Sequence, residues 1–191
     1  MLSEELLLLR APFRGYLRLG EAPPSPWLGV LRLQLVLAVF VSLTTAGRLV
    51  PFHVASIVLT WGFVPAWQAL AVLAGHAVAR SPRSRRDALG LYFAGHAPWQ
   101  LLLLLVAGVC VLVSDPAAVG AFALRRGILP ALVLSTAFAG ILLTHASYRA
   151  GHALPRGRAI AATLAFYLVY VGGIVGWYLA QGQLQPLLGY R

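Results

Sequence analysis

Five long apolar stretches, separated by short polar segments, dominate the sequence. A helix needs about 20 residues to cross the hydrocarbon core of a bilayer, and each stretch is close to that length. The pattern therefore predicts an all-α bundle of five transmembrane helices. Their expected spans are residues 28–47, 54–79, 97–114, 127–148 and 159–180. Residues 87–96 are expected to form a helical lead-in to the third span, and Pro65 is expected to kink the second.

The segment before the first span has a different pattern. Arg10, Arg14 and Arg18 follow one another at intervals of four residues, and apolar side chains occupy other faces. This predicts an amphipathic interfacial helix in residues 2–20, broken near Pro12, that lies in the headgroup plane. The chain thus divides into an interfacial segment, a transmembrane domain and a C-terminal tail, at residues 1–26, 27–181 and 182–191.

Composition supports a membrane protein. Hydrophobic residues make up 60% of the chain and charged residues only 10%, whereas a soluble domain carries about 25% charged residues. Most of the outer surface must therefore face lipid. The acidic N-terminus lacks the positive start and the cleavage site of a secretory signal. All 15 basic residues are arginine, which fits a GC-rich bacterial genome.

The arginines are distributed unevenly between the two ends of the predicted bundle. Arg48, Arg125, Arg126 and Arg191 fall on one side. The other side receives Arg10, Arg14, Arg18, Arg32, Arg80, Arg83, Arg85, Arg86, Arg149, Arg156 and Arg158. Because basic residues are enriched in cytoplasmic loops, the bias predicts a cytoplasmic N-terminus and an external C-terminus in a bacterial inner membrane. Arginines placed between apolar runs set topology, so nucleic acid is not an expected partner despite the net charge of +10.

The predicted cytoplasmic ends of spans two and four resemble each other. Both read H-A-x-x-R followed by P-R-x-R, as two parallel repeats would. His and Arg four residues apart share a helical face, and a guanidinium suits phosphate. The motif predicts an anion site for lipid headgroups or an acidic partner; its alternative is that the arginines only fix topology. The candidate residues are His76, Arg80, Arg83, Arg85, His145, Arg149, Arg156 and Arg158.

Histidines suggest a second function. Ala-Gly-His-Ala occurs at 74–77, 94–97 and 150–153, and four of the five histidines fall near the predicted cytoplasmic boundary, with only His53 beyond it. Two histidines from facing helices could ligate haem iron, as in a b-type anchor subunit of a redox complex. The candidate ligands are His76, His96 and His145. A zinc site is less well supported, because no carboxylate or thiol lies close to these histidines.

Residues for catalysis or proton-coupled transport are scarce. The five acids lie outside the predicted spans, and neither a nucleophile elbow nor a phosphate-binding loop is present. We therefore expect no enzyme activity and no resident cofactor. A small transporter or channel is a further alternative, against which the missing intramembrane carboxylate argues.

The predicted spans also contain features that point to close helix packing. Gln68 and Gln100 are expected to hydrogen-bond between helices. Gly172 and Gly176 have GxxxG spacing, which predicts close packing within the chain or in a homodimer. The leading expectation is an interaction, scaffold or lipid-contacting subunit whose partners are membrane lipids and other membrane subunits.

Several stretches resemble the Yip-type membrane proteins, a five-span family whose eukaryotic members interact with Rab GTPases. Residues 8–14 are similar to the opening before the first span of that family. Residues 69–80 and 87–98 resemble its second span and its entry to the third, and residues 141–164 resemble its fourth and fifth spans with the basic turn between them. The resemblance implies a five-helix bundle with a role in membrane organisation or partner binding, and it supplies no catalytic residue.

Overall fold

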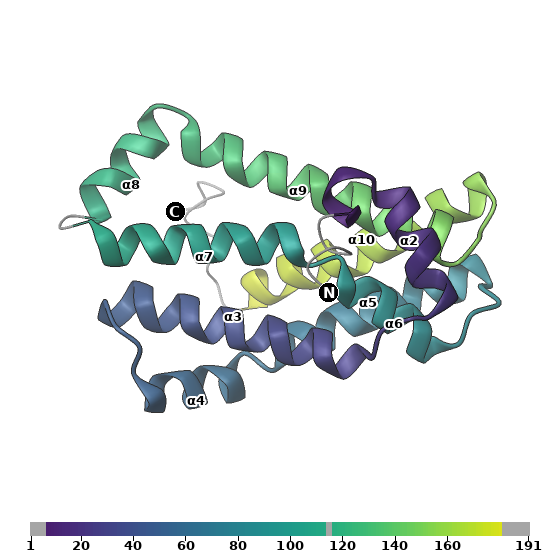
Figure 1. Ribbon diagram of the computed structural model, residues 1–191, viewed down its shortest axis with the longest axis horizontal. Helices are drawn as coiled ribbons and strands as arrows, with labels where there is room; N and C mark the ends of the chain where they lie inside the picture. The colour runs from purple at the N-terminus through teal and green to yellow at the C-terminus, as the bar shows by residue number, and fades with distance from the viewer. Residues whose placement is uncertain (1–6, 114–115, 181–191) are drawn as a thin grey trace.

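The computed structural model describes residues 7–113 and 116–180, and within them all regular structure is helical (Figure 1). Four parts of the sequence predictions lie outside the described residues: positions 1–6, Asp115, the tail 182–191 and the side chain of His53. Everything below refers to the described part of the chain.

Five helical stretches are long and apolar enough to cross a membrane. They are Pro26–Ala46, Val54–Ala79, Arg85–Leu112, Ile128–Gly151 and Arg156–Trp177. Figure 1 shows them running back and forth along the long axis of the molecule. Large apolar side chains cover their outer faces; Leu59 is 81% exposed and Leu168 78%. An apolar surface of this extent needs a lipid surrounding, so the prediction of an all-α five-helix membrane bundle is confirmed.

The second span is interrupted at Trp61 and Gly62, one turn before Pro65, where the sequence predicted a kink. Helix α3 (Pro26–Ala46) precedes α4 (Pro51–Thr60) and α5 (Phe63–Ala79), with a turn at Trp61 and Gly62. Proline lacks an N–H, and its ring clashes with the carbonyl four residues earlier, which for Pro65 is that of Trp61. The Trp61 carbonyl instead accepts hydrogen bonds from the Val64 N–H and from Gln34 Nε2 of α3, each at 3.0 Å. The proline therefore ends α4 one turn before its own position.

The third span begins with the predicted lead-in. Helix α6 (Arg85–Ala94) leads through a turn at Gly95 and His96 into α7 (Ala97–Leu112). Pro98 lies in the first turn of α7, where its missing N–H costs no hydrogen bond.

Two features, one before the fourth span and one at its end, were not predicted from the sequence. A short helix, α8 (Pro116–Arg125), precedes α9 (Ile128–Ala146). Helix α9 does not stop at its predicted end but continues as the π-helix η1 (Ser147–Gly151), after which α10 (Arg156–Ala180) returns through the bundle.

Close approach of α10 to α5 forms much of the core. A Cβ at Gly75 would meet the Tyr148 hydroxyl and the Ala162 carbonyl, and one at Gly173 would meet the ring of Trp67. By contrast, Gly172 and Gly176 face open space. The prediction that Gly172 and Gly176 pack within the chain is therefore wrong. The glycine at which α10 approaches α5 is the neighbouring Gly173.

The N-terminal helix α2 (Pro12–Glu21) packs on the end of the bundle against η1 and α9. It follows a short helical stretch that is interrupted at Ala11, beside Pro12. Its buried residues are Gly15, Tyr16, Leu19 and Gly20. The arginines at positions 10, 14 and 18 point outward, as do Leu9, Phe13 and Leu17.

Candidate functional site

Arginines gather at one end of the bundle, which we call the basic end. It comprises α2, the turn at residues 80–84 with the start of α6, and η1 with the turn that leads into α10, at the right of Figure 1. All eight candidate residues of the predicted anion site lie in these segments or at the helix ends that lead into them. Arg48, Arg125 and Arg126 lie at the opposite end.

The turn after α5 is set by its own backbone. Arg80 takes a left-handed conformation (φ 47°), which ends α5, and the Ser81 N–H then donates to the His76 carbonyl at 3.3 Å. Ser84 caps α6 by accepting a hydrogen bond from the Asp87 N–H at 3.1 Å. The helix reversal is therefore tight, and it exposes Arg80 and Arg85.

The turn after η1 is held differently, although its sequence is similar. Arg149 Nη1 donates to the Leu154 carbonyl at 2.7 Å, and the Leu154 N–H donates back to the Tyr148 carbonyl at 3.4 Å. The hydrogen bonds of a π-helix join residues five apart instead of four, and such segments are frequent at functional sites. Arg149, predicted as an anion ligand, thus also closes the turn that carries the second P-R-x-R.

A single hydrogen bond joins these two turns. Ser81 Oγ lies 2.8 Å from His152 Nδ1, across 71 positions of sequence. The His76 and Tyr148 rings lie beside His152, with centroids at 5.9 Å and 5.2 Å. Ser81 Oγ also accepts the Arg83 N–H at 3.3 Å. The Ser81 hydroxyl can donate to His152 Nδ1 or accept from it, depending on the imidazole tautomer.

The C-terminal end of α2 closes over the same place. A Cβ on Gly20 would lie 3.0 Å from the Gly151 carbonyl oxygen and 3.1 Å from Arg83 Nη2. These distances are tight for a Cβ, so glycine at position 20 favours the close approach of α2 to both turns. The basic end is therefore one continuous surface made from three separate parts of the chain.

His152 carries no charge at neutral pH. It is 1% exposed, and burial lowers its pKa from 6.5 to about 4, with further lowering by His76 and Arg83 and an opposing effect from Asp87. The centre of the basic end is thus a neutral hydrogen-bonded group surrounded by exposed guanidinium groups.

The remaining candidate ligands form a second group near α2. His145 Nδ1 lies 3.3 Å from Thr163 Oγ1, and the Phe13 ring meets the His145 ring edge-on at 6.2 Å. Arg149 and Arg156 are near enough to act on His145 electrostatically, and Arg158 is exposed on the first turn of α10. The predicted residues thus form two groups, one around His152 and one around His145. His152 itself was not among the candidates.

The histidines considered as haem ligands each have a different neighbour. His76 lies against His152, His96 Nε2 lies 3.2 Å from Gln68 Oε1, and His145 contacts Thr163. Within the described residues, no three His, Cys, Asp or Glu side chains are grouped as a metal site would require.

The Ala-Gly-His-Ala repeats were the signal that could have identified His152. In each repeat the glycine admits a close neighbour: the Tyr148 hydroxyl at Gly75, the Tyr16 hydroxyl at Gly95 and the Leu91 side chain at Gly151. The repeated tetrapeptide therefore marks places of close packing. The histidines of its first and third copies, His76 and His152, lie side by side.

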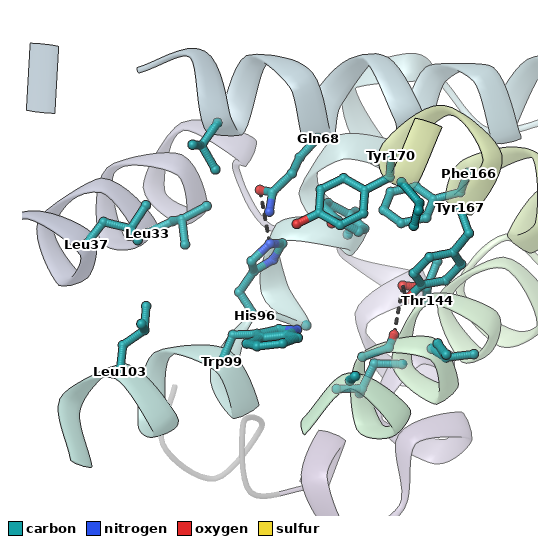
Figure 2. Close-up of a pocket in the computed structure, with 18 of the residues that line it drawn as sticks. Leu33, Leu37, Gln68, His96, Trp99, Leu103, Thr144, Phe166, Tyr167 and Tyr170 are labelled. Atoms are coloured by element: carbon teal, nitrogen blue, oxygen red, sulfur yellow. Dashed lines mark hydrogen bonds between the residues drawn. The ribbon is translucent and has the colours of Figure 1, made fainter. Parts of the chain in front are cut away.

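A cavity of about 490 Å³ lies between α3, α5, α7, α9 and α10 and is partly open to the outside of the bundle (Figure 2). Its wall includes the hydrogen-bonded Gln68 and His96, and Tyr16 of α2 also lines it. The Gln68 contact confirms the hydrogen bond expected for this residue, whereas Gln100 Nε2 is buried without a hydrogen-bond partner among the described residues. Thr144 donates to the Gly140 carbonyl at 2.8 Å and lies 3.4 Å from the Tyr167 hydroxyl.

The five apolar helices define the class of the molecule, which is a multi-pass helical membrane protein. Comparison with protein-family models, with curated proteins and with solved structures finds no match to the chain.

Proposed function

We propose that this chain is a non-enzymatic membrane protein that contacts anionic lipid headgroups through the basic end, as a lipid-contacting or scaffold subunit. We further propose that the basic end faces the cytoplasm of a bacterium, as the arginine bias favours. The observation that carries the proposal is the Ser81–His152 hydrogen bond, which places two arginine-bearing turns side by side.

The charge of this surface suits phosphate. The exposed arginines have only two acids near them in the described chain, Glu21 and Asp87. Guanidinium groups bind phosphate oxygens through paired hydrogen bonds. Each basic residue near an anionic membrane surface contributes about 1 kcal/mol to the attraction. Because His152 is neutral, it joins the turns without adding to the repulsion between the arginines.

Helix α2 supports the same proposal. Its outward face carries Phe13 and Leu17, exposed by 40% and 56%, beside Arg14 and Arg18; Leu9 and Arg10 lie in the short helical stretch that precedes it. An apolar row beside a basic row on one short helix is the pattern of a helix seated at the headgroup boundary. The Yip-type resemblance supports a role in membrane organisation and adds protein partners to the expected contacts.

The test compares two charge-matched variants. Arg85→Gln/Arg156→Gln/Arg158→Gln removes three exposed arginines of the basic end, and Arg48→Gln/Arg125→Gln/Arg126→Gln removes three at the opposite end. We expect the first variant to bind phosphatidylglycerol at least about tenfold more weakly in detergent, measured by native mass spectrometry, and the second to bind like the wild type. Equal affinity in the two variants would overturn the proposal.

The purified protein also tests the haem alternative. A sample whose visible spectrum is colourless is the expected result. A Soret band with a dithionite-sensitive α-band would instead favour a b-type haem.

A further inference from the structure

We propose that the intramembrane cavity is a binding site for one uncharged, lipid-soluble molecule with a planar conjugated ring that bears a carbonyl or hydroxyl oxygen, the chemistry of a quinone or a phenol. The inference is independent of the basic end. It rests on the size, the polarity and the layout of the cavity wall.

The cavity has the size and surface of a small-molecule site. Its volume of about 490 Å³ falls within the range of about 300–1,000 Å³ that is usual for such pockets. Its lining is mostly aliphatic and aromatic and includes no Asp, Glu, Lys or Arg. A charged group would lose its hydration among these side chains, which favours a neutral occupant.

One end of the cavity carries a polar anchor. Gln68 and His96 are 6% and 5% exposed, and they hydrogen-bond to each other from α5 and from the turn before α7. Figure 2 shows the Tyr170 hydroxyl directed toward this pair. An amide, an imidazole and a phenol together can donate to a ligand oxygen or accept from one. The anchor therefore fits a carbonyl as well as a hydroxyl group.

The same end is enclosed by aromatic rings. Tyr92 contacts both His96 and Phe166, with ring centroids at 4.8 Å and 5.1 Å, and Phe166 stacks on Tyr170 at 5.5 Å. Trp99 lies on the other side of His96 (Figure 2). Aromatic side chains held in place by one another form good stacking surfaces for a planar ring.

The opposite end of the cavity is aliphatic. Leu33, Leu37 and Leu103 line it from α3 and α7, apart from the aromatic cluster (Figure 2). A ring at the Gln68–His96 anchor would leave room for an alkyl or isoprenoid tail among these leucines. The wall thus matches an amphipathic molecule with its polar ring at one end.

The test uses decyl-benzoquinone as the probe, with laurate as an anionic alkyl control and tryptophan fluorescence quenching as the readout. The wild-type protein should bind the quinone saturably and laurate poorly. Gln68→Leu should weaken quinone binding about tenfold, because it removes a hydrogen bond, and Ala137→Phe, which fills the cavity, should abolish it.

Gln34→Leu is the matched control, because it also removes a buried glutamine amide from a span but not one that lines the cavity. It should bind the quinone like the wild type. Wild-type affinity in both Gln68→Leu and Ala137→Phe, or laurate binding as tight as that of the quinone, would overturn the inference. If Gln68→Leu does not fold, Ala137→Phe decides alone.

Discussion

At the level of single residues, the contact between Ser81 and His152 determines the shape of the basic end. It lies where two turns, each rich in arginine, would otherwise repel one another. A protonated His152 would add a further positive charge, at a buried position, beside His76 and Arg83. The neutral form of His152 is therefore part of the folded structure.

This gives a prediction for pH dependence. The pKa of His152 is about 4 in the folded protein against 6.5 for the free side chain, so the unfolded chain binds the proton first as the pH falls. Neutral His152 stabilises the folded state fully above about pH 6.5. This contribution, on the order of 3 kcal/mol, is lost as the pH falls toward 4. Thermal unfolding in detergent should show a steeper loss of stability over this range in the wild type than in His152→Gln. Identical slopes would contradict the prediction.

His152 also shows what sequence reasoning could not reach at this scale. Its sequence neighbours resemble those of His76 and His96, and all three follow a glycine. Their partners are Ser81, Gln68 and residues from other helices, and spacing within one helix does not reveal contacts across 71 positions. The chemistry of the histidines could be predicted, but not which of them would meet.

At the level of elements, hydropathy was sufficient to locate the five spans, because lipid selects for length and apolarity alone. The breaks within spans were harder to predict. The end of α4 depends on Pro65 and also on Gln34, which satisfies the Trp61 carbonyl from another helix. The buried face of α2 could not be predicted either, because Gly15 and Gly20 carry no apolar side chain that would mark it. Their close neighbours are seen only in the structure.

The contact between α5 and α10 predicts opposite effects for two glycine substitutions. Gly75→Ala would press on the Tyr148 hydroxyl and the Ala162 carbonyl, which should cost about 1–3 kcal/mol. Gly172→Ala meets open space and should stabilise the helix by up to about 1 kcal/mol, since alanine has the better helix propensity. Unfolding temperatures in detergent give the comparison. A destabilised Gly172→Ala would show that this face is packed against something in solution.

At the level of the whole molecule, Arg48, Arg125 and Arg126 lie at the opposite end of the bundle from the basic end. Five crossings predict that the chain enters and leaves the bundle on opposite sides of the bilayer. The sign of the arginine bias then predicts which side is cytoplasmic.

Reporter fusions to the full chain check this orientation. A green fluorescent protein at the N-terminus should fluoresce and an alkaline phosphatase at the C-terminus should be active, because each reporter works on one side of a bacterial inner membrane only. Exchanging the two reporters is the control and should silence both. A fluorescent C-terminal fusion would contradict the predicted topology.

Tyr16 links the two surfaces of the molecule. It is 1% exposed, it belongs to the buried face of α2, and it also lines the intramembrane cavity. Burial raises the pKa of its hydroxyl, which therefore stays protonated. If the cavity binds a molecule in contact with Tyr16 while α2 is docked, that molecule favours the docked position, and by thermodynamic reciprocity a membrane that drew α2 outward would weaken its binding by the same factor. Under the two proposals, the state of the lipid surface and the occupancy of the cavity would be coupled through Tyr16.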